Sequence, residues 1–169
     1  MSQTVRQHKA ESPQHLRVAV ITVSDTRTLE TDTGGAAIVE RLDAAGHALV
    51  DRRLVRDEST ELEAALHELT GHDTVDAVLI TGGTGLGSRD RTYETVDALL
   101  TKALPGYGEL FRWLSYAEIG PACMLSRAVG GLIGRTVVLT MPGSPAGVAL
   151  AMDKVILPEL GHLVREARR

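Results

Sequence analysis

The chain has 169 residues, of which 43% are hydrophobic and 24% charged, with a formal net charge of −4 and a pI near 5.8. This length fits one domain with a sizeable core. The acidic balance argues against broad binding to nucleic acid or to an anionic membrane, because either partner requires a basic face.

The polar N-terminus lacks the apolar stretch of a signal peptide, so residues 1–15 are expected to form a flexible tail and residues 16–169 a single domain. No segment stays apolar over the roughly 18 residues that a membrane span needs. The single cysteine, Cys123, cannot form an intramolecular disulfide and is interpreted as a buried small hydrophobe. We therefore expect a cytoplasmic protein.

The first apolar run, Val18 to Val23, does not alternate with polar residues and predicts a strand buried on both faces of a sheet. Helical spacing follows it and stops at Gly46, a residue typical of helix C-termini. A weaker run, Ala48 to Val55, is interrupted by charged residues. It predicts a strand closer to the edge of the sheet.

The next helix is predicted to open with a capping box made by Thr60 and Glu63 and to close at Gly71. A second buried strand is predicted at Ala77 to Ile80. A helical pattern then runs from Val96 to the residues before Pro105, where proline stops it.

The last strand is predicted at Thr136 to Met141, and Ser144-Pro145 is a typical start for the helix after it. A final helix around residues 160–167 ends in arginines, which its dipole favours. Strands that alternate with helices predict an α/β fold with a mostly parallel sheet flanked by helices.

Three loops rich in glycine and hydroxyl residues follow the predicted strands: residues 24–35, 81–90 and 142–145. In such a sheet, ligands bind at the carboxyl ends of the strands. The middle loop has four glycines within six residues, which lets backbone N–H groups wrap an anion. It is neither a Walker A loop nor a dinucleotide fingerprint, because Ser88 and Arg89 stand where those motifs need other residues. A glycine turn without a ligand is the alternative.

Asp57 and Asp90 are the candidate acids. Asp57 lies just past the predicted strand at Ala48 to Val55, and Asp90 ends the glycine-rich loop. Two carboxylates at one sheet edge could hold Mg²⁺, which takes few protein ligands and completes its shell with water and phosphate oxygens. The alternatives are that Asp90 caps the following helix and that Asp57 is a solvated loop acid. Arg89 and Arg127 could supply positive charge for phosphates.

Four of the five aromatic residues fall between Tyr107 and Tyr116. Such clustering indicates a core segment, a subunit interface or a ring-stacking wall, and the first two are favoured.

Six segments in order resemble the MoaB/MogA family of molybdenum cofactor biosynthesis proteins. They are Thr-Val-Ser-Asp (22–25), Asp-Thr-Gly-Gly (32–35), Thr-Gly-Gly-Thr-Gly (81–85) with Ser-Arg-Asp (88–90), Pro-Gly-Tyr-Gly-Glu (105–109), Leu-Ser-Arg-Ala (125–128) and Met-Pro-Gly-Ser (141–144). The resemblance covers roughly residues 16–165. It implies a three-layer α/β sandwich that assembles as a homotrimer or as a hexamer of two trimers.

The activity that the resemblance implies is Mg-ATP-dependent adenylylation of molybdopterin, a nucleotidyltransferase reaction that gives adenylated molybdopterin and pyrophosphate. A transient contact with the molybdate-inserting enzyme would follow. By position, Asp57 and Asp90 match the family's two catalytic acids, and both are the expected Mg²⁺ ligands. The expected nucleotide and substrate residues are Ser24, Asp25, Gly82, Gly83, Thr84, Gly85, Arg89, Ser126, Arg127, Pro142, Gly143 and Ser144.

The chain departs from the family's pattern in one place, and its sequence does not decide whether it belongs to the catalytic members of the family. Members often have Thr-Pro after the Arg-Asp pair, whereas this chain has Tyr93 in place of the proline. The stretch from Trp113 to Ala128 is more similar to the MoaB branch, in which some proteins lack one of the acids. A non-catalytic molybdopterin-binding or scaffold protein of the same pathway is therefore the alternative, and Asp57 is the feature that favours catalysis.

Overall fold

The computed structural model describes residues 9–169, and its centre is a six-stranded sheet in the order β2-β1-β3-β6-β5-β4. The strands are β1 (Arg17–Val23), β2 (Ala48–Val55), β3 (Ala77–Thr81), β4 (Lys102–Ala103), β5 (Gly130–Ile133) and β6 (Thr136–Met141). Neighbours among β1, β2, β3 and β6 are parallel, whereas β5 runs antiparallel to both β6 and β4. The predicted α/β fold with a mostly parallel sheet is confirmed.

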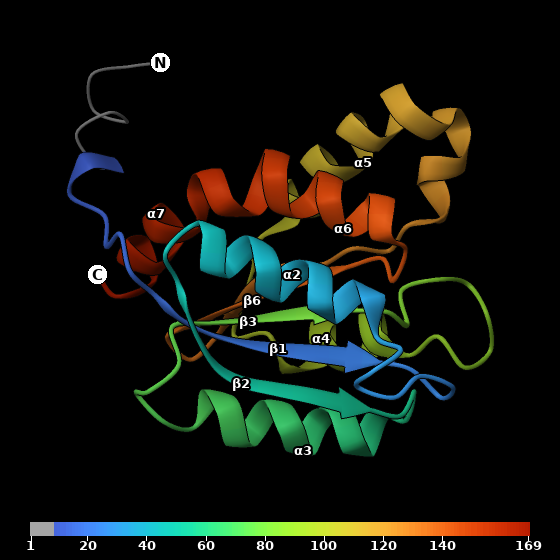
Figure 1. Cartoon of the computed structure of the whole chain (residues 1–169), viewed down its shortest axis with the longest axis horizontal. Helices are drawn as coiled ribbons and strands as arrows, with labels where there is room; N and C mark the ends of the chain where they lie inside the picture. Colours follow the sequence, from blue (N-terminus) through green and yellow to red (C-terminus); the bar gives the residue numbers. More distant parts are fainter. Residues whose placement is uncertain (1–8) are drawn as a thin grey trace.

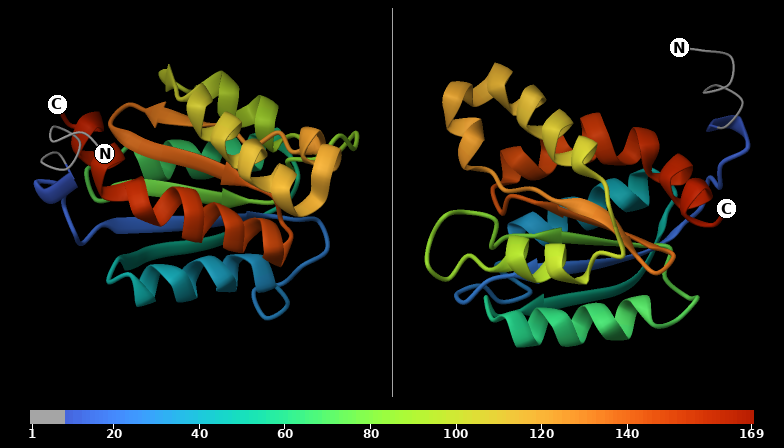
Figure 2. Two further views of the ribbon diagram at one scale, coloured as in Figure 1. Left: turned by 90° about the horizontal axis from the view of Figure 1, so that it is seen from above. Right: turned by 180° about the vertical axis from the view of Figure 1, so that it is seen from behind.

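Helices cover both faces of this sheet (Figure 1). Their bounds are α2 (Thr33–Ala44), α3 (Ser59–Thr70), α4 (Thr92–Leu99), α5 (Pro105–Ile119), η1 (Gly120–Leu125), α6 (Pro145–Ala151), η2 (Met152–Ile156) and α7 (Leu157–Ala167). The three views agree that α2 and the α6–α7 helix lie on one face and α3 on the other (Figures 1 and 2).

Alternating residues of the same strand supply the two cores. Val18 and Val20 of β1 belong to the cluster that contains Ile38 of α2 and the residues of α5 to α7. Ala19 and Ile21 belong to the cluster on the face of α3 and α4. Because both faces are buried, a strand such as β1 must be apolar at every position, which is why its sequence does not alternate.

Most predicted elements are present, with three differences. The expected capping box at Thr60 and Glu63 is wrong, because α3 begins at Ser59 and no side chain caps it. The predicted helix before Pro105 ends at Leu99, and residues 102–103 form β4 instead. Helices α6 and α7 are joined through a π-helical turn, residues 152–156. Pro158, two residues further on, has no N–H and interrupts the regular hydrogen-bond ladder.

The expected N-terminal tail falls into two parts. Residues 1–8 lie outside the described residues. Residues 9–15 lie against α7: Lys9 forms an ion pair with Glu159, and Arg165 forms one with Glu11. No helix among residues 9–169 is long and apolar enough to cross a membrane.

The strand register brings the loops of interest together. Val23 of β1 lies opposite Val55 of β2, and Thr81 of β3 lies opposite both Thr22 of β1 and Met141 of β6. The loops that follow four parallel strands therefore leave the sheet in one row, where ligands of open α/β sheets bind.

Candidate active site

A cavity of about 420 Å³ opens at this edge of the sheet. The glycine loop, residues 82–85, lines it together with Asp90, and residues 142–144 line it together with the start of α6. The remaining wall comes from α5 and the segment after it. It contains Phe111, Ser115, Glu118, Ile119, Leu125 and Ser126. The cavity thus joins a polar glycine-rich side to a largely apolar helical side.

A second cavity, of about 440 Å³, is lined by Ser24, Arg27 and Asp32 from the β1–α2 region. It shares Gly82, Gly143 and Ser144 with the first cavity. A Cβ atom on Gly143 would lie 3.4 Å from the Cα of Gly82, so the two turns nearly touch. The two cavities therefore meet at this pair of glycines, an arrangement that suits two reactants.

The glycine loop has a backbone that only glycine fits. Gly82 and Gly83 have φ angles of 97° and 62°, and a Cβ on Gly82 would stand 2.3 Å from the carbonyl oxygen of Val23. A Cβ on Gly83 would stand 2.2 Å from Thr92 Oγ1. The loop is consequently a defined structure packed on β1 and α4.

Asp57 lies beside this loop and is half-buried. Its Oδ1 accepts a hydrogen bond from the Arg91 N–H at 3.2 Å, and its own N–H donates to Asp25 Oδ1 at 3.1 Å. Burial raises the pKa of Asp57 above its ordinary value, and the charges of Asp90 and Asp25 add to the effect. The position is one where an additional cation would be favoured.

Asp90 closes the glycine loop on itself. Its Oδ2 accepts a hydrogen bond from the Gly87 N–H at 2.7 Å, and a Cβ on Gly85 or Gly87 would come within 2.7 Å of the same oxygen. The alternative role as a helix cap is wrong, because the residue that caps α4 is Arg91, with no side-chain hydrogen bond. The structure thus brings Asp57, from the loop after β2, and Asp90 to the same glycine loop, at the shared sheet edge that the sequence predicts.

Arg89 pairs with acids from two neighbouring loops. Its Nε and Nη2 donate to the two carboxylate oxygens of Asp25 at 2.7 and 3.1 Å, and Nη2 also donates to Glu58 at 2.9 Å. These hydrogen bonds raise the pKa of Arg89 and lower that of Asp25. The predicted use of Arg89 charge for a phosphate would require this pair to open.

Arg127 contacts the glycine loop from the opposite side. Its Nε donates to the Gly85 carbonyl and its Nη2 to the Asp90 carbonyl, each at 2.8 Å, while Nη1 pairs with Glu94. The neighbouring Ser126 lines the first cavity, and its Oγ is buried without a hydrogen-bond partner in the described chain. Ser126 is thus placed to meet a ligand, whereas Arg127 is engaged with the protein.

The remaining predicted residues lie at the two cavities. Ser144 caps α6, with its Oγ accepting from the Gly147 N–H at 3.2 Å, which confirms the predicted helix start. Pro142 holds the adjoining turn, because its carbonyl accepts from Thr81 Oγ1 at 2.9 Å. Ser24 Oγ accepts from the N–H groups of Thr26 and Arg27, at 3.3 and 3.2 Å, and so shapes the β1–α2 loop.

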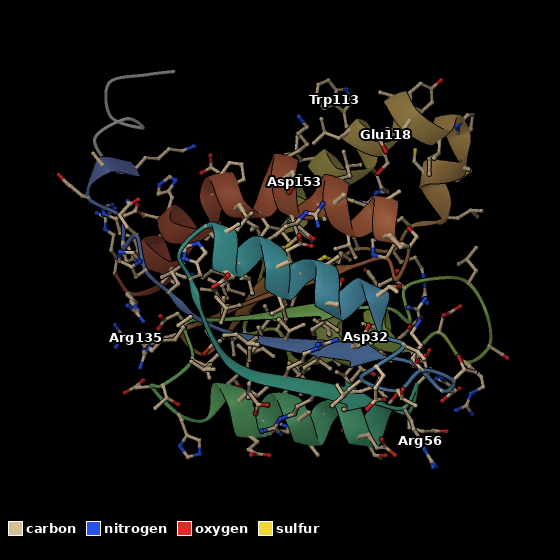
Figure 3. All side chains as sticks on the ribbon, viewed as in Figure 1. Asp32, Arg56, Trp113, Glu118, Arg135 and Asp153 are labelled. Carbon is tan, nitrogen blue, oxygen red and sulfur yellow. The ribbon has the colours of Figure 1, made fainter. Side chains whose placement is uncertain are left out.

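The sequence placed Asp32 within the Asp-Thr-Gly-Gly segment without giving it a role, and in the structure its side chain is fully buried beside the second cavity. It accepts hydrogen bonds from the Gly35 N–H at 2.8 Å and Thr22 Oγ1 at 2.7 Å, and pairs with Arg52 at 3.0 Å. Figure 3 shows it at the start of α2, next to the end of β1. An aspartate three residues before a glycine at a helix start was the available signal.

Mg²⁺ is the metal that the resemblance implies for this site. Among residues 9–169, no three His, Cys, Asp or Glu side chains gather into a metal centre. Mg²⁺ does not need such a centre, because one or two carboxylates with water and phosphate oxygens suffice. Asp57 accepts one hydrogen bond in the described structure and has oxygen lone pairs left over. The residues present therefore fit Mg²⁺ held jointly with a phosphate-bearing ligand.

A glycine loop at the carboxyl edge of a parallel sheet, with two acids and two adjoining cavities, defines an α/β protein suited to phosphate-bearing ligands. Comparison with known proteins gives the family. Residues 19–162 match the family described as a probable molybdopterin binding domain, and the chain belongs to it.

Relatives and solved structures agree with this assignment. The molybdenum cofactor biosynthesis protein B of Bacillus anthracis is 48% identical over 167 residues, which cover 98% of this chain and 99% of the relative. The crystal structure of a molybdenum cofactor biosynthesis protein B is 49% identical with a TM-score of 0.90, covering 94% of this chain and 99% of the other. The tungsten cofactor synthesizing protein MoaB of Pyrococcus furiosus is 36% identical with a TM-score of 0.83, covering 94% and 100%. The expected membership of the MoaB/MogA family is confirmed.

Proposed function

We propose that the protein acts in molybdenum cofactor biosynthesis by transferring AMP from Mg-ATP to the terminal phosphate of molybdopterin. Its family and the names of its relatives support the pathway. The two cavities that meet at Gly82 and Gly143 support a reaction between two bound molecules. The products are adenylated molybdopterin and pyrophosphate.

The observation that carries the proposal is the placement of Asp57. Its carboxylate lies against Gly83, with both oxygens 3.1 Å from where a Cβ on that glycine would be. Burial, together with the charges of Asp90 and Asp25, raises its pKa, so the charged form gains when a divalent cation binds beside it. A structural acid would instead be expected to have a cationic side-chain partner, as Asp32 has in Arg52.

In the proposed reaction, an oxygen of the molybdopterin phosphate forms a bond to the α-phosphorus of ATP. The bond from that phosphorus to the β-phosphate oxygen breaks, and pyrophosphate leaves with the electron pair. Mg²⁺, when bound, neutralises charge that develops on the phosphate oxygens. The chain supplies in-line positioning through the glycine loop, and the nucleophile is already anionic, so no strong general base is required.

The test is to mix the protein with Mg-ATP and molybdopterin and to measure adenylated molybdopterin and pyrophosphate. Asp57→Asn should lower turnover by about a hundredfold or more, because the variant loses a charge that acts on the metal in the transition state. Asp97→Asn, which removes an exposed carboxylate on α4, is the matched control and should retain full turnover. The proposal fails if the folded wild-type protein binds molybdopterin and yields no adenylate.

A second candidate is a non-catalytic molybdopterin-binding or scaffold protein of the same pathway. One observation favours it: Arg89 is already paired with Asp25 and Glu58, so its charge is engaged by the protein. A pure carrier would bind molybdopterin without nucleotide. Calorimetry with Mg-ATP alone separates the two candidates, because saturable heat of binding counts against a carrier.

We further propose that the protein is a homotrimer or hexamer whose contacts include α5 and η1. This surface exposes large apolar residues: Leu110, Trp113, Tyr116, Ile119, Met124 and Leu125. Trp113 is 72% exposed, and Figure 3 shows it on the side of α5 that is turned away from the sheet. An apolar patch of this kind marks an interaction surface. Light scattering gives the mass in solution, and a monomeric mass would refute the proposal. The transient contact with the molybdate-inserting enzyme that the resemblance implies stays a prediction.

A further inference from the structure

We infer that Arg127 is a positioning residue for Asp57, acting through the glycine loop and a single peptide group. Its guanidinium reaches both ends of the loop segment 85–90, since Nε donates to the Gly85 carbonyl and Nη2 to the Asp90 carbonyl, each at 2.8 Å. The Arg127 N–H also donates to the Thr84 carbonyl at 3.2 Å. One residue thus fixes three carbonyl groups of the loop.

The contact with Asp90 continues to Asp57 through one peptide. The carbonyl of Asp90 accepts from Arg127, and the N–H on the other side of that same peptide belongs to Arg91. This N–H donates to Asp57 Oδ1 at 3.2 Å. Because the C=O and N–H of a trans peptide point in opposite directions, the orientation that serves Arg127 also aims the N–H at Asp57. The positive charge on one side polarises the peptide toward the carboxylate on the other.

Arg127 is itself held in place from the α4 side. Its Nη1 forms an ion pair with Glu94, and its guanidinium carbon lies 5.4 Å from the centre of the Tyr93 ring. Both partners belong to the first turn of α4, which follows the loop directly. Tyr93 stands where family members often have proline, and here the aromatic ring gives the guanidinium a face to lie on.

The inference deepens the proposed function, because Asp57 matters as a candidate catalytic residue only if the adenylyl transfer takes place. It differs from the role expected from the sequence, in which Arg127 belongs to the residues that contact the ligand. With three guanidinium contacts to the protein, the side chain acts on the loop before any ligand arrives. The two roles, positioning of Asp57 and direct contact with a ligand, therefore predict different behaviour of the loop in the ligand-free protein.

The experiment measures amide hydrogen exchange of Arg91 and Gly87 in the ligand-free protein, together with the dissociation constant of Mg-ATP. Arg127→Met keeps roughly the length of the side chain and removes the guanidinium group with its forked N–H donors. It should speed exchange of the Arg91 N–H by about tenfold, the effect of losing one net hydrogen bond, and weaken Mg-ATP binding. Arg127→Lys should fall between Met and wild type, because it keeps the charge without the fork.

Arg41→Met is the matched control. Arg41 also forms one carboxylate pair, with Asp153, and one bond to a backbone carbonyl, that of Ala37, but it lies on α2 and does not contact the loop. It should leave the exchange of Arg91 and the affinity for Mg-ATP unchanged. If Arg127→Met does not fold, Glu94→Gln removes the anchor of Arg127 and should raise Arg91 exchange by a smaller factor, about threefold.

Two results would overturn the inference. In the first, Arg127→Met weakens Mg-ATP binding while Arg91 exchange stays at the wild-type rate, which would make Arg127 a direct ligand contact. In the second, Arg127→Met, or Glu94→Gln in its place, changes neither quantity. A wild-type protein that makes no adenylate would refute the proposed function and leave the exchange result, and so the positioning role, to be judged separately.

Discussion

Replacing Gly83 with alanine should both destabilise the protein and displace Asp57. Gly83 has a φ of 62°, a left-handed conformation that costs alanine about 1–2 kcal/mol. The new Cβ would also stand 2.2 Å from Oγ1 of Thr92, the fully buried first residue of α4, so one of the two must shift. Crowding of this kind adds about 1–3 kcal/mol. We expect a total loss of about 3 kcal/mol in the free energy of unfolding.

For a chain of this length, that loss corresponds to a fall in Tm of about 6–12 °C. Thermal unfolding followed by circular dichroism measures it. Gly106→Ala is the control, because a Cβ there meets nothing within 4 Å at the start of α5, and it should raise stability slightly, by about 0.5 kcal/mol. Gly83→Ala should in addition weaken Mg-ATP binding, since both oxygens of Asp57 lie 3.1 Å from the new Cβ.

A double-mutant cycle tests the cause. Thr92 Oγ1 has no hydrogen-bond partner among the described residues, so Thr92→Ala sacrifices no bond and opens space for the new Cβ. In the double variant, about 1–2 kcal/mol of the loss should return. The reasoning is refuted if Gly83→Ala melts within about 2 °C of wild type or if the two substitutions are additive.

Three further predictions concern other parts of the molecule. Although burial raises the pKa of Asp32, hydrogen bonds from Gly35 and Thr22 and the pair with Arg52 hold it below its ordinary value of 3.8. The contribution of Asp32 to the free energy of unfolding is thus complete above pH 3.8 and is lost as pH falls through its lower pKa in the folded state. Urea unfolding measured from pH 7 to pH 3 should therefore show a smaller fall in the free energy of unfolding for Asp32→Asn than for wild type. Gly35→Ala should cost about 3 kcal/mol in the same assay, because its Cβ would come 2.1 Å from Asp32 Oδ2; an unchanged unfolding midpoint would contradict this. Trp113→Glu should lower the mass found by light scattering while leaving the unfolding of the monomer intact, and an unchanged mass would remove Trp113 from the proposed interface.

The sequence alone predicted the buried strands and the loop that follows each of them. Strands β1, β3 and β6 are covered on both faces, and such burial requires unbroken apolar runs that can be found without knowing the neighbours. The start of α6 was equally local, since Ser144 and Pro145 cap it through residues within one turn. Because parallel strands share a carboxyl edge, the meeting of the glycine loop with Asp57 and residues 142–144 also followed.

The antiparallel strands β4 and β5 and the helix α5 were not predicted. Gly130 and Gly131 look like a turn in the sequence, yet in the fold a Cβ on Gly130 would strike Leu139, and one on Gly131 would strike the Lys102 carbonyl. Close packing between distant segments requires glycine there. Similarly, Gly106 and Gly108 weaken helix propensity in α5, and packing of Tyr107 and Phe111 into the core offsets that loss.

The partners of the charged residues were decided by the tertiary structure alone. The sequence offered Arg89 and Arg127 as charges for a phosphate, whereas the fold pairs Arg89 with Asp25, 64 residues away, and joins Arg127 to Gly85, 42 residues away. Apolar periodicity records which face of an element is buried. Apolar periodicity does not predict which loop lies opposite an arginine. That depends on strand order and register, which are set by all the elements together.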